Sequence, residues 1–383
     1  MRRVACTVAF SAAMLFAAVA PARAYCPSYT PAQTSGGKNC GVEPQAGKNP
    51  STAEWKAIIA KVAGGKASWA ADGPDIQSLN AGCGKPIVRH AVDAHFPCIV
   101  LGAIAMQESG WKQFCVPESP AQSIGAPERT LVSFDCGYGV GQVTSGMHAG
   151  EATSFDRARV AADPTYNLAT GTLLLRSKWA ATSCVGDNNP DVVEDWYSAI
   201  WAYNGLSYSN NPNNPNLGAG RGPYDPKNGG SYTYQERVLG WMEHPPSAAH
   251  WPAIAVAYPN RGDLGTKGAP PELPAPSCAS PTSCAKTRPT HVATCDGEVA
   301  SRDGGAFDDA GSSIVLEAGA TPVPDKGDGV EGAPQETPQD VPQRSDGCAC
   351  RVTRAEAPGA DGRLVLSSAC LLVLGFRRRA RRG

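Results

Sequence analysis

The chain has 383 residues, a formal net charge of −1 at pH 7 and 14 cysteines. A charge so close to zero argues against nucleic acid as a partner, because phosphate binding requires a basic surface. No Cys-x-x-Cys pair with matching histidine spacing is present, so the sequence predicts no metal site, and no motif in it requires a cofactor.

Residues 1–24 are typical of a secretory signal peptide, with a basic start, an apolar stretch at 8–19 and the small-residue cleavage site Ala22-Arg23-Ala24. We expect cleavage before Tyr25, because a lipoprotein-type box is absent. Export makes disulfides the default state of the cysteines, although their connectivity cannot be deduced from the sequence. A free or intermolecular thiol is the alternative, because seven cysteines, an odd number, lie between residues 26 and 184.

The first predicted helix follows an irregular Gly-, Pro- and Ser-rich arm over residues 25–50. Ser51-Thr52-Ala53-Glu54 forms a capping box, and Gly64-Gly65 ends the helix. Apolar side chains at core spacing fill the helix between these signals. They are Trp55, Ile58, Ile59 and Val62.

The stretch from Pro97 to Gly110 predicts the central helix of the domain. No side chain from Cys98 to Met106 is charged or strongly polar, so every face of this helix should be buried. Its first ionisable group is Glu108, in the last turn. Burial and the negative end of the helix dipole both raise the pKa of such a carboxyl, which makes it a candidate general acid. The alternative is a solvated glutamate where the helix reaches water.

An irregular segment covers residues 111–136, and we hypothesise that its bracketing cysteines, Cys115 and Cys136, pair with each other. The next stretch, 137–147, contains four glycines within ten residues, which indicates close backbone approach or unusual dihedral angles. An ordinary turn is the alternative. A phosphate-binding loop is not predicted, because the Lys-Ser/Thr ending is missing.

Three further helices are predicted. Asp163-Pro164 begins one that runs to about Trp179, Asn189-Pro190 begins another that Asn204-Gly205 ends, and the last covers about 232–243. The alternation typical of strands is scarce. Residues 25–255 are therefore predicted to form a mainly α domain with long, disulfide-pinned loops.

Beyond residue 255 the composition changes. Residues 256–346 are rich in Pro, Gly, Ala, Asp and Glu, which predicts a disordered linker, with a small disulfide knot over the region from Cys278 to Cys295. Residues 347–383 contain Gly-Cys-Ala-Cys, an apolar run at 364–376 and five terminal arginines. That run is short for the ~20 residues that span a bilayer, and the arginines would hold this end in the cytoplasm.

Five motifs occur in an order that resembles a known family. They are Glu108-Ser109, Gly139-Val140-Gly141-Gln142-Val143, Asp163-Pro164 with Asn167-Leu168, Gly171 and Leu174, Ala202-Tyr203-Asn204-Gly205, and Tyr234-Gln235-Glu236-Arg237-Val238. Together they resemble the soluble-lytic-transglycosylase-like members of the lysozyme superfamily, over about residues 90–245. Each motif is weak alone, but five in register are specific.

The resemblance implies a lysozyme-like fold, no cofactor, and cleavage of peptidoglycan strands at the β-1,4 bond between N-acetylmuramic acid and N-acetylglucosamine. It implies that Glu108 gives a proton to the glycosidic oxygen and then takes one from the muramyl 6-hydroxyl, which closes a 1,6-anhydro ring. We expect Tyr203 to hydrogen-bond Glu108 and hold its rotamer, with a buried helix-end aromatic as the alternative. The residues expected to line the sugar site are Ser109, Gln142, Tyr203, Asn204 and Tyr234.

Two departures from the family pattern matter. Gly141 replaces a methionine, and Asp135-Cys136-Gly137-Tyr138 stands where Ser and Gly-Ala are usual. Goose-type lysozymes carry an acid-containing segment at a similar place, so Asp135 is a candidate second carboxylate; a loop aspartate that caps local N–H groups is the alternative. Two other functions stay open: a goose-lysozyme-type hydrolase that uses Asp135, and a non-catalytic peptidoglycan-binding surface protein.

The tail also has a likeness. Gly-Cys-x-Cys, a short apolar segment and terminal arginines resemble the C-terminal sorting signal of myxobacterial surface proteins. This resemblance implies that residues 347–383 engage membrane or sorting machinery and are processed near the cysteines, and a simple inner-membrane anchor is the alternative. The expected location is outside the cytoplasm, at the cell surface or outer membrane or in the periplasm.

Overall fold

The computed structural model describes residues 40–83, 89–116, 128–218, 220–292, 295 and 299–301. The predicted signal peptide (1–24) and the predicted tail (347–383) lie outside the described residues, as does the predicted linker from 302 to 346. The described part is mainly α-helical, as predicted, with small two-stranded sheets. Among the described helices, none has the length and apolar character needed to cross a membrane.

The first helix, α2 (Thr52–Ala63), begins and ends as predicted. The Ser51 hydroxyl accepts a hydrogen bond from the Glu54 backbone N–H at 3.3 Å, and the Glu54 carboxylate accepts one from the Ser51 N–H at 2.7 Å. At Gly64 the chain turns into a short second helix, α3 (Gly65–Trp69). The capping residues therefore decide where this helix starts, and the glycines where it stops.

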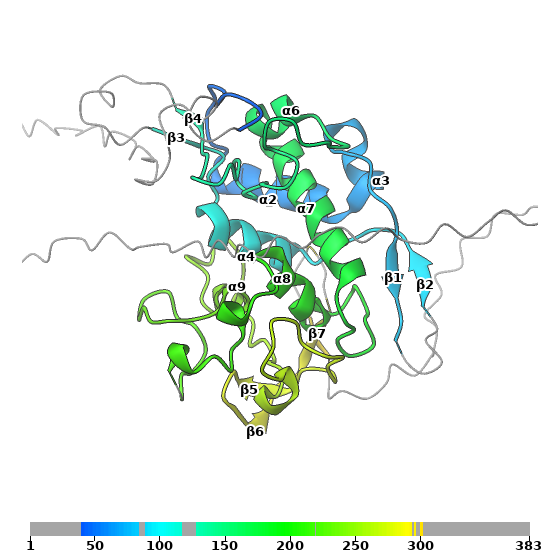
Figure 1. Ribbon diagram of the computed structural model, residues 1–383, viewed down its shortest axis with the longest axis vertical. Coiled ribbons are helices and arrows are strands. Elements are labelled where there is room, and N and C mark those ends of the chain that lie inside the picture. The colour runs from blue at the N-terminus through cyan, green and yellow to red at the C-terminus, as the bar shows by residue number, and fades with distance from the viewer. Residues whose placement is uncertain are drawn as a thin grey trace, which may run out of the picture. The chain divides into compact units, whose positions relative to one another are not determined.

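The predicted central helix is α4 (Cys98–Ser109). Its residues from Ile99 to Met106 are all buried, and Gly110 ends it in the left-handed conformation with φ 64°. Pro97 lies just outside the first turn, at the N-cap. Helices α2 and α9 (Tyr234–Glu243) both pack against α4, and Figure 1 shows α4 (cyan) between them.

Helix α7 (Pro164–Ala181) also follows its predicted start. The Asp163 carboxylate accepts hydrogen bonds from the backbone N–H groups of Thr165 and Tyr166 at 2.9 and 3.1 Å, and proline occupies the first helical position. A short helix that the sequence analysis did not predict, α6 (Arg157–Ala162), packs against α7.

The helix predicted to begin at Asn189-Pro190 starts later. The chain passes through a 3₁₀ turn at Val193–Trp196 and enters α8 (Tyr197–Tyr203). The Asn189 side chain accepts a hydrogen bond from the Asp191 N–H at 2.9 Å, so it stabilises a local turn there. Further 3₁₀ turns are Ala70–Asp72, Tyr208–Asn210, Pro215–Leu217 and Arg261–Leu264.

The described strands form four antiparallel pairs, each of two short strands. The pairs are β1 (Leu79–Ala81) with β2 (His90–Val92), β3 (Phe114–Cys115) with β4 (Arg129–Thr130), β5 (Cys278–Ser280) with β6 (Ser283–Thr287), and β7 (Thr290–Val292) with β8 (Val299–Ser301). Strands of two to five residues are too short to show the alternation on which a prediction of strands depends.

The disulfides differ from those hypothesised. The described pairs are Cys40–Cys136, Cys83–Cys184, Cys98–Cys295 and Cys278–Cys284. The predicted Cys115–Cys136 bridge is therefore wrong: Cys136 bonds to Cys40, and Cys115 is disulfide-bonded elsewhere. Within the predicted knot at 278–295, Cys278 bonds to Cys284, but Cys295 lies outside it, because it bonds to the first residue of α4. Several disulfides are typical of proteins from an oxidising, non-cytoplasmic compartment.

The folded part extends past the predicted boundary at residue 255. Val256, Tyr258, Leu264 and Leu273 are buried in the same core as α4, so the predicted start of the linker at 256 is wrong. The segment has few apolar residues and no helical period, and its buried side chains, carried by short strands, a 3₁₀ turn and loops, pack in the same core as the helices. Composition alone therefore could not distinguish it from a linker.

Candidate active site

The Glu108 side chain lies in the last turn of α4 and meets a hydroxyl from α9. The Tyr234 Oη–H donates a hydrogen bond to Glu108 Oε1 at 2.5 Å. Tyr234 is the first residue of α9, so the end of one helix and the start of the other bring these two groups together. Sequence analysis assigned Tyr234 to the sugar lining, and the structure gives it this direct contact with the candidate acid.

The environment of Glu108 raises the pKa of its carboxyl from an ordinary value of 4.5 to about 7. Burial is the largest cause, because the charged form loses its hydration. The hydrogen bond from Tyr234 lowers the pKa by stabilising the carboxylate, and the negative charge of Asp135 raises it. Near neutral pH, the carboxyl can therefore either give or take a proton.

The glycine-rich stretch forms a tight turn beside the end of α4. Two buried amide side chains hold its backbone: Gln113 Oε1 accepts from the Val140 N–H at 3.0 Å, and Asn167 Oδ1 accepts from the Gly141 N–H at 2.9 Å. Gly139 has φ 63°, and a Cβ there would lie 2.1 Å from Gln113 Oε1, so only glycine fits. Of the two readings of this stretch, the structure favours close backbone approach.

Tyr203 binds the glycine-rich turn, which corrects its expected role. Its hydroxyl donates to the Gly141 carbonyl at 2.7 Å, whereas Tyr234 makes the bond to Glu108 that was expected of Tyr203. Gly171 of α7 permits this contact, because a Cβ at that position would lie 2.9 Å from Tyr203 Oη. Asn167 and Gly171 thus act together: both position the backbone of Gly141.

The two tyrosine rings lie nearly parallel, with centroids 6.4 Å apart and planes inclined by 17°. Burial raises the pKa of Tyr203 far above its ordinary value, and the charge of Glu108 raises it further. Tyr203 therefore stays protonated and serves as a hydrogen-bond donor at all physiological pH values.

Asp135 lies on a narrow hairpin, where Tyr138 pairs with both Val132 and Val143. A short hydrogen bond from the Ser133 hydroxyl holds its carboxylate, and the Cys40–Cys136 disulfide holds the next residue. Its charge contributes, after burial, to the raised pKa of Glu108. The two carboxylates named from the sequence are thus electrostatic neighbours.

Three other predicted residues contribute mainly to local structure. The Ser109 hydroxyl lies 3.0 Å from the Ala105 carbonyl and 3.1 Å from the Val140 carbonyl and can donate its one proton to either, so the bond to Val140 ties the end of α4 to the glycine-rich turn. Gln142 Nε2 donates to a carbonyl of its own turn, that of Gly139, at 2.8 Å. The side chain of Asn204 accepts from Asn210 Nδ2 at 3.2 Å, in the loop after α8.

Sequence analysis missed Gln113, which is fully buried and donates from Nε2 to the carbonyls of Val160 and Ala161 at 3.0 Å each. It connects α6 to the glycine-rich turn. Its place in an irregular segment gave no signal of this role. Within the described ranges, no cluster of His, Cys, Asp and Glu could hold a metal ion.

The comparisons with known proteins add no relative. No protein-family model matches the chain, and neither a curated protein nor a solved structure matches it.

Proposed function

We propose that the protein is a lytic transglycosylase that cleaves the β-1,4 bond between N-acetylmuramic acid and N-acetylglucosamine in peptidoglycan strands. The observation that carries the proposal is the Glu108 carboxyl, whose pKa is raised to about 7 and which accepts a hydrogen bond from Tyr234 at 2.5 Å. The sequence motifs that resemble the family supply the substrate class.

In the proposed reaction, protonated Glu108 gives its proton to the glycosidic oxygen as the bond to the leaving sugar breaks. The substrate's acetamido group stabilises the positive anomeric carbon. The carboxylate, which Tyr234 stabilises, then takes the proton from the muramyl 6-hydroxyl, and the oxygen closes the 1,6-anhydro ring. A group that acts first as acid and then as base requires a pKa near the working pH, and the raised pKa of Glu108 supports both steps.

A second candidate function is hydrolysis by the same site, and the charge of Asp135 acting on Glu108 favours it. Two carboxylates that flank one sugar can direct a water molecule to the anomeric carbon. The product would then have a reducing end, whereas the transglycosylase product is lighter by one water. A non-catalytic peptidoglycan-binding protein is the remaining alternative, and it gives no reason for a carboxyl with a raised pKa.

Digestion of purified sacculi tests these functions. Wild type, Glu108→Gln and Asp135→Asn are compared by turbidity and by mass spectrometry of the released fragments, with Glu43→Gln as a control at an exposed glutamate. We expect anhydro products from wild type, Asp135→Asn and the control, and no products from Glu108→Gln. Reducing products that disappear in Asp135→Asn would establish the hydrolase, and no digestion by any of them would favour the binding protein.

A further inference from the structure

The start of α9 is fixed by a capping box whose acid lies in the protein interior. The Glu236 carboxylate accepts hydrogen bonds through Oε2 from the Thr233 backbone N–H and hydroxyl, at 2.9 and 3.0 Å. Thr233 immediately precedes Tyr234, the residue that contacts Glu108. Glu236 therefore holds the backbone from which the Tyr234 side chain extends.

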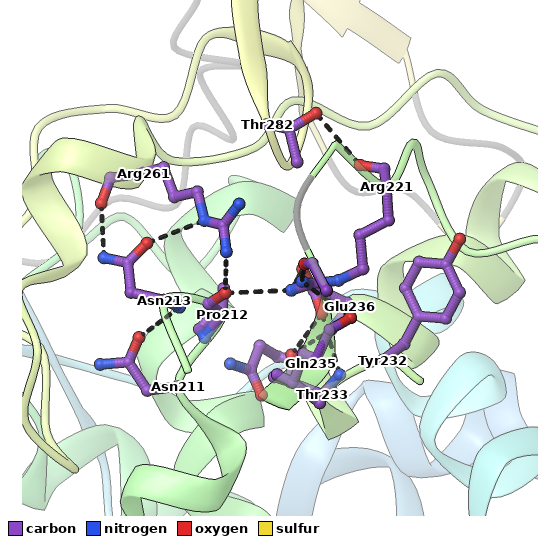
Figure 2. A network of polar contacts seen from close by, with 12 residues as sticks. Asn211, Pro212, Asn213, Arg221, Tyr232, Thr233, Gln235, Glu236, Arg261 and Thr282 are labelled. Carbon is purple, nitrogen blue, oxygen red and sulfur yellow. Dashed lines mark hydrogen bonds and ion pairs between the residues drawn. The ribbon is translucent and has the colours of Figure 1, made fainter. Parts of the chain in front are cut away.

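The other oxygen of the same carboxylate pairs with an arginine. Arg221 Nη2 donates to Glu236 Oε1 at 2.7 Å, and the two side chains are only 9% and 1% exposed (Figure 2). The same guanidinium donates to the carbonyls of Pro212 and Gly218 at 3.1 and 2.7 Å. One planar cation thus connects the start of α9 to the loop that follows α8.

The segment beyond residue 255 holds this loop from the other side. Arg261 Nε donates to Asn213 Oδ1 at 2.8 Å, and Asn213 Nδ2 donates to the Arg261 carbonyl at 2.9 Å. A short hydrogen bond joins the Arg261 guanidinium to the Pro212 carbonyl, and the Thr282 hydroxyl donates to the Arg221 carbonyl at 3.1 Å. The contacts in Figure 2 therefore form one continuous network, from Arg261 and Thr282 in the segment beyond residue 255 to Thr233, which precedes Tyr234.

A buried ion pair is poor evidence of a contribution to stability, because the loss of hydration offsets most of the attraction between the charges. Its fixed geometry, by contrast, can hold a particular arrangement of elements. Arg221 serves such an arrangement well, because its fork donates to a carboxylate and to two carbonyls at once.

We infer that Arg221 is a positioning residue of the active site: through Glu236 and the capping box of α9 it places the Tyr234 hydroxyl on the Glu108 carboxylate. The catalytic role of Arg221 rests on the proposed function. The link from Arg221 to the Tyr234 hydroxyl, by contrast, is a property of the folded protein. The titratable groups that interact with Glu108 are Tyr234 from α9, by a hydrogen bond, and Asp135 from the hairpin and Tyr203 from α8, by charge alone. Of these, Tyr234 is the one that the Arg221 network positions.

The test is a carboxyl ¹³C NMR titration of Glu108, which needs no substrate. The double variant Arg221→Gln with Glu236→Gln keeps the net charge of the pair at zero, and it is compared with wild type, with Tyr234→Phe and with the triple variant. If Arg221 acts through Tyr234, the double variant raises the proton affinity of Glu108 in the same direction as Tyr234→Phe, by up to about tenfold. In the Tyr234→Phe background, the double substitution causes no further change.

Two results would overturn the inference: an unchanged Glu108 midpoint in a folded double variant, or a shift of the same size with and without the Tyr234 hydroxyl. If the double variant does not fold, Arg221→Lys replaces it, because lysine keeps the charge but not the fork. We then expect Arg221→Lys to raise the titration midpoint of Glu108 in the wild-type background and not in the Tyr234→Phe background. An unchanged midpoint refutes the inference. Failure of the proposed function would appear separately, as undigested sacculi with the titration behaviour intact.

Discussion

Replacing Glu108 by glutamine should stabilise the protein at alkaline pH and have little effect at acidic pH. The unfolded chain loses the Glu108 proton near pH 4.5, whereas the folded protein keeps it until about pH 7. Between these values the folded state binds more protons than the unfolded state, so this carboxyl lowers the free energy of unfolding as the pH rises through that window. Glutamine has nearly the same shape as glutamate and no charge. The free energy of unfolding of Glu108→Gln therefore does not fall in this pH window.

The magnitude follows from the two pKa values. A difference between 4.5 and about 7 corresponds to about 3 kcal/mol at pH 8, with little left at pH 4. Glu108 is partly exposed, and solvent screening reduces this figure, so we expect a gain of about 1.5–3 kcal/mol. For a folded unit of this size, that is a rise of roughly 3–12 °C in the melting temperature.

Thermal unfolding of wild type and Glu108→Gln at pH 4 and pH 8 measures the effect. The exposed Glu43, replaced by glutamine, is the matched control, because an exposed carboxyl has no burial penalty to remove. We expect the difference between wild type and Glu108→Gln to grow between pH 4 and pH 8, and the difference for Glu43→Gln to stay constant. A Glu108→Gln difference that is equal at both pH values would refute the reasoning that burial raises the pKa.

Three other predictions concern the surroundings of Glu108. Tyr234→Phe should raise the pKa of Glu108 by about one unit, because a hydrogen bond to a charged group is worth about 1.5 kcal/mol; a midpoint that falls in the NMR titration would contradict this. Gly171→Ala should destabilise the fold by about 1–3 kcal/mol, since the new methyl group would lie 2.9 Å from a tyrosine hydroxyl, whereas Gly222→Ala has open space and should have no such effect in urea unfolding. Cys40→Ser should cost about 4.7 kcal/mol in the same assay, because its bridge spans 96 residues, and a loss below about 1 kcal/mol would disprove the chain-entropy estimate.

The elements that the sequence predicted well are those with local signals. The starts of α2 and α7 follow from side chains that bond to backbone groups two or three residues away. The burial of α4 follows from its uninterrupted apolar sequence, and the raised pKa of Glu108 follows from its place at the end of that helix. Where a local signal had two outcomes, as at Asn189, which can cap a helix or close a turn, the turn formed and the prediction failed.

The parts that could not be predicted depend on contacts between distant segments. Tyr203 and Tyr234 have the same side chain, and their ring centroids lie 6.4 Å apart. The sequence alone therefore could not show which hydroxyl reaches Glu108. The Cys98–Cys295 bridge spans 197 residues and joins segments that the composition assigned to different regions. The role of Gln113 depends likewise on α6, which lies more than 40 residues further along the chain.

The helix that carries Glu108 is fixed at both ends, and this has a physical reason. A carboxyl whose ionisation costs about 1.5–3 kcal/mol would gain that energy back if the last turn of α4 unwound and released it to water. The hydrogen bonds from Ser109 to the Val140 carbonyl and from Tyr234 to the carboxylate oppose this unwinding at one end. At the other end, the bridge from Cys98 removes about 5 kcal/mol of chain entropy from the unfolded state, so the fold tolerates the cost. The raised pKa therefore depends on these restraints as much as on the apolar surroundings, because a frayed helix end would return it toward its ordinary value.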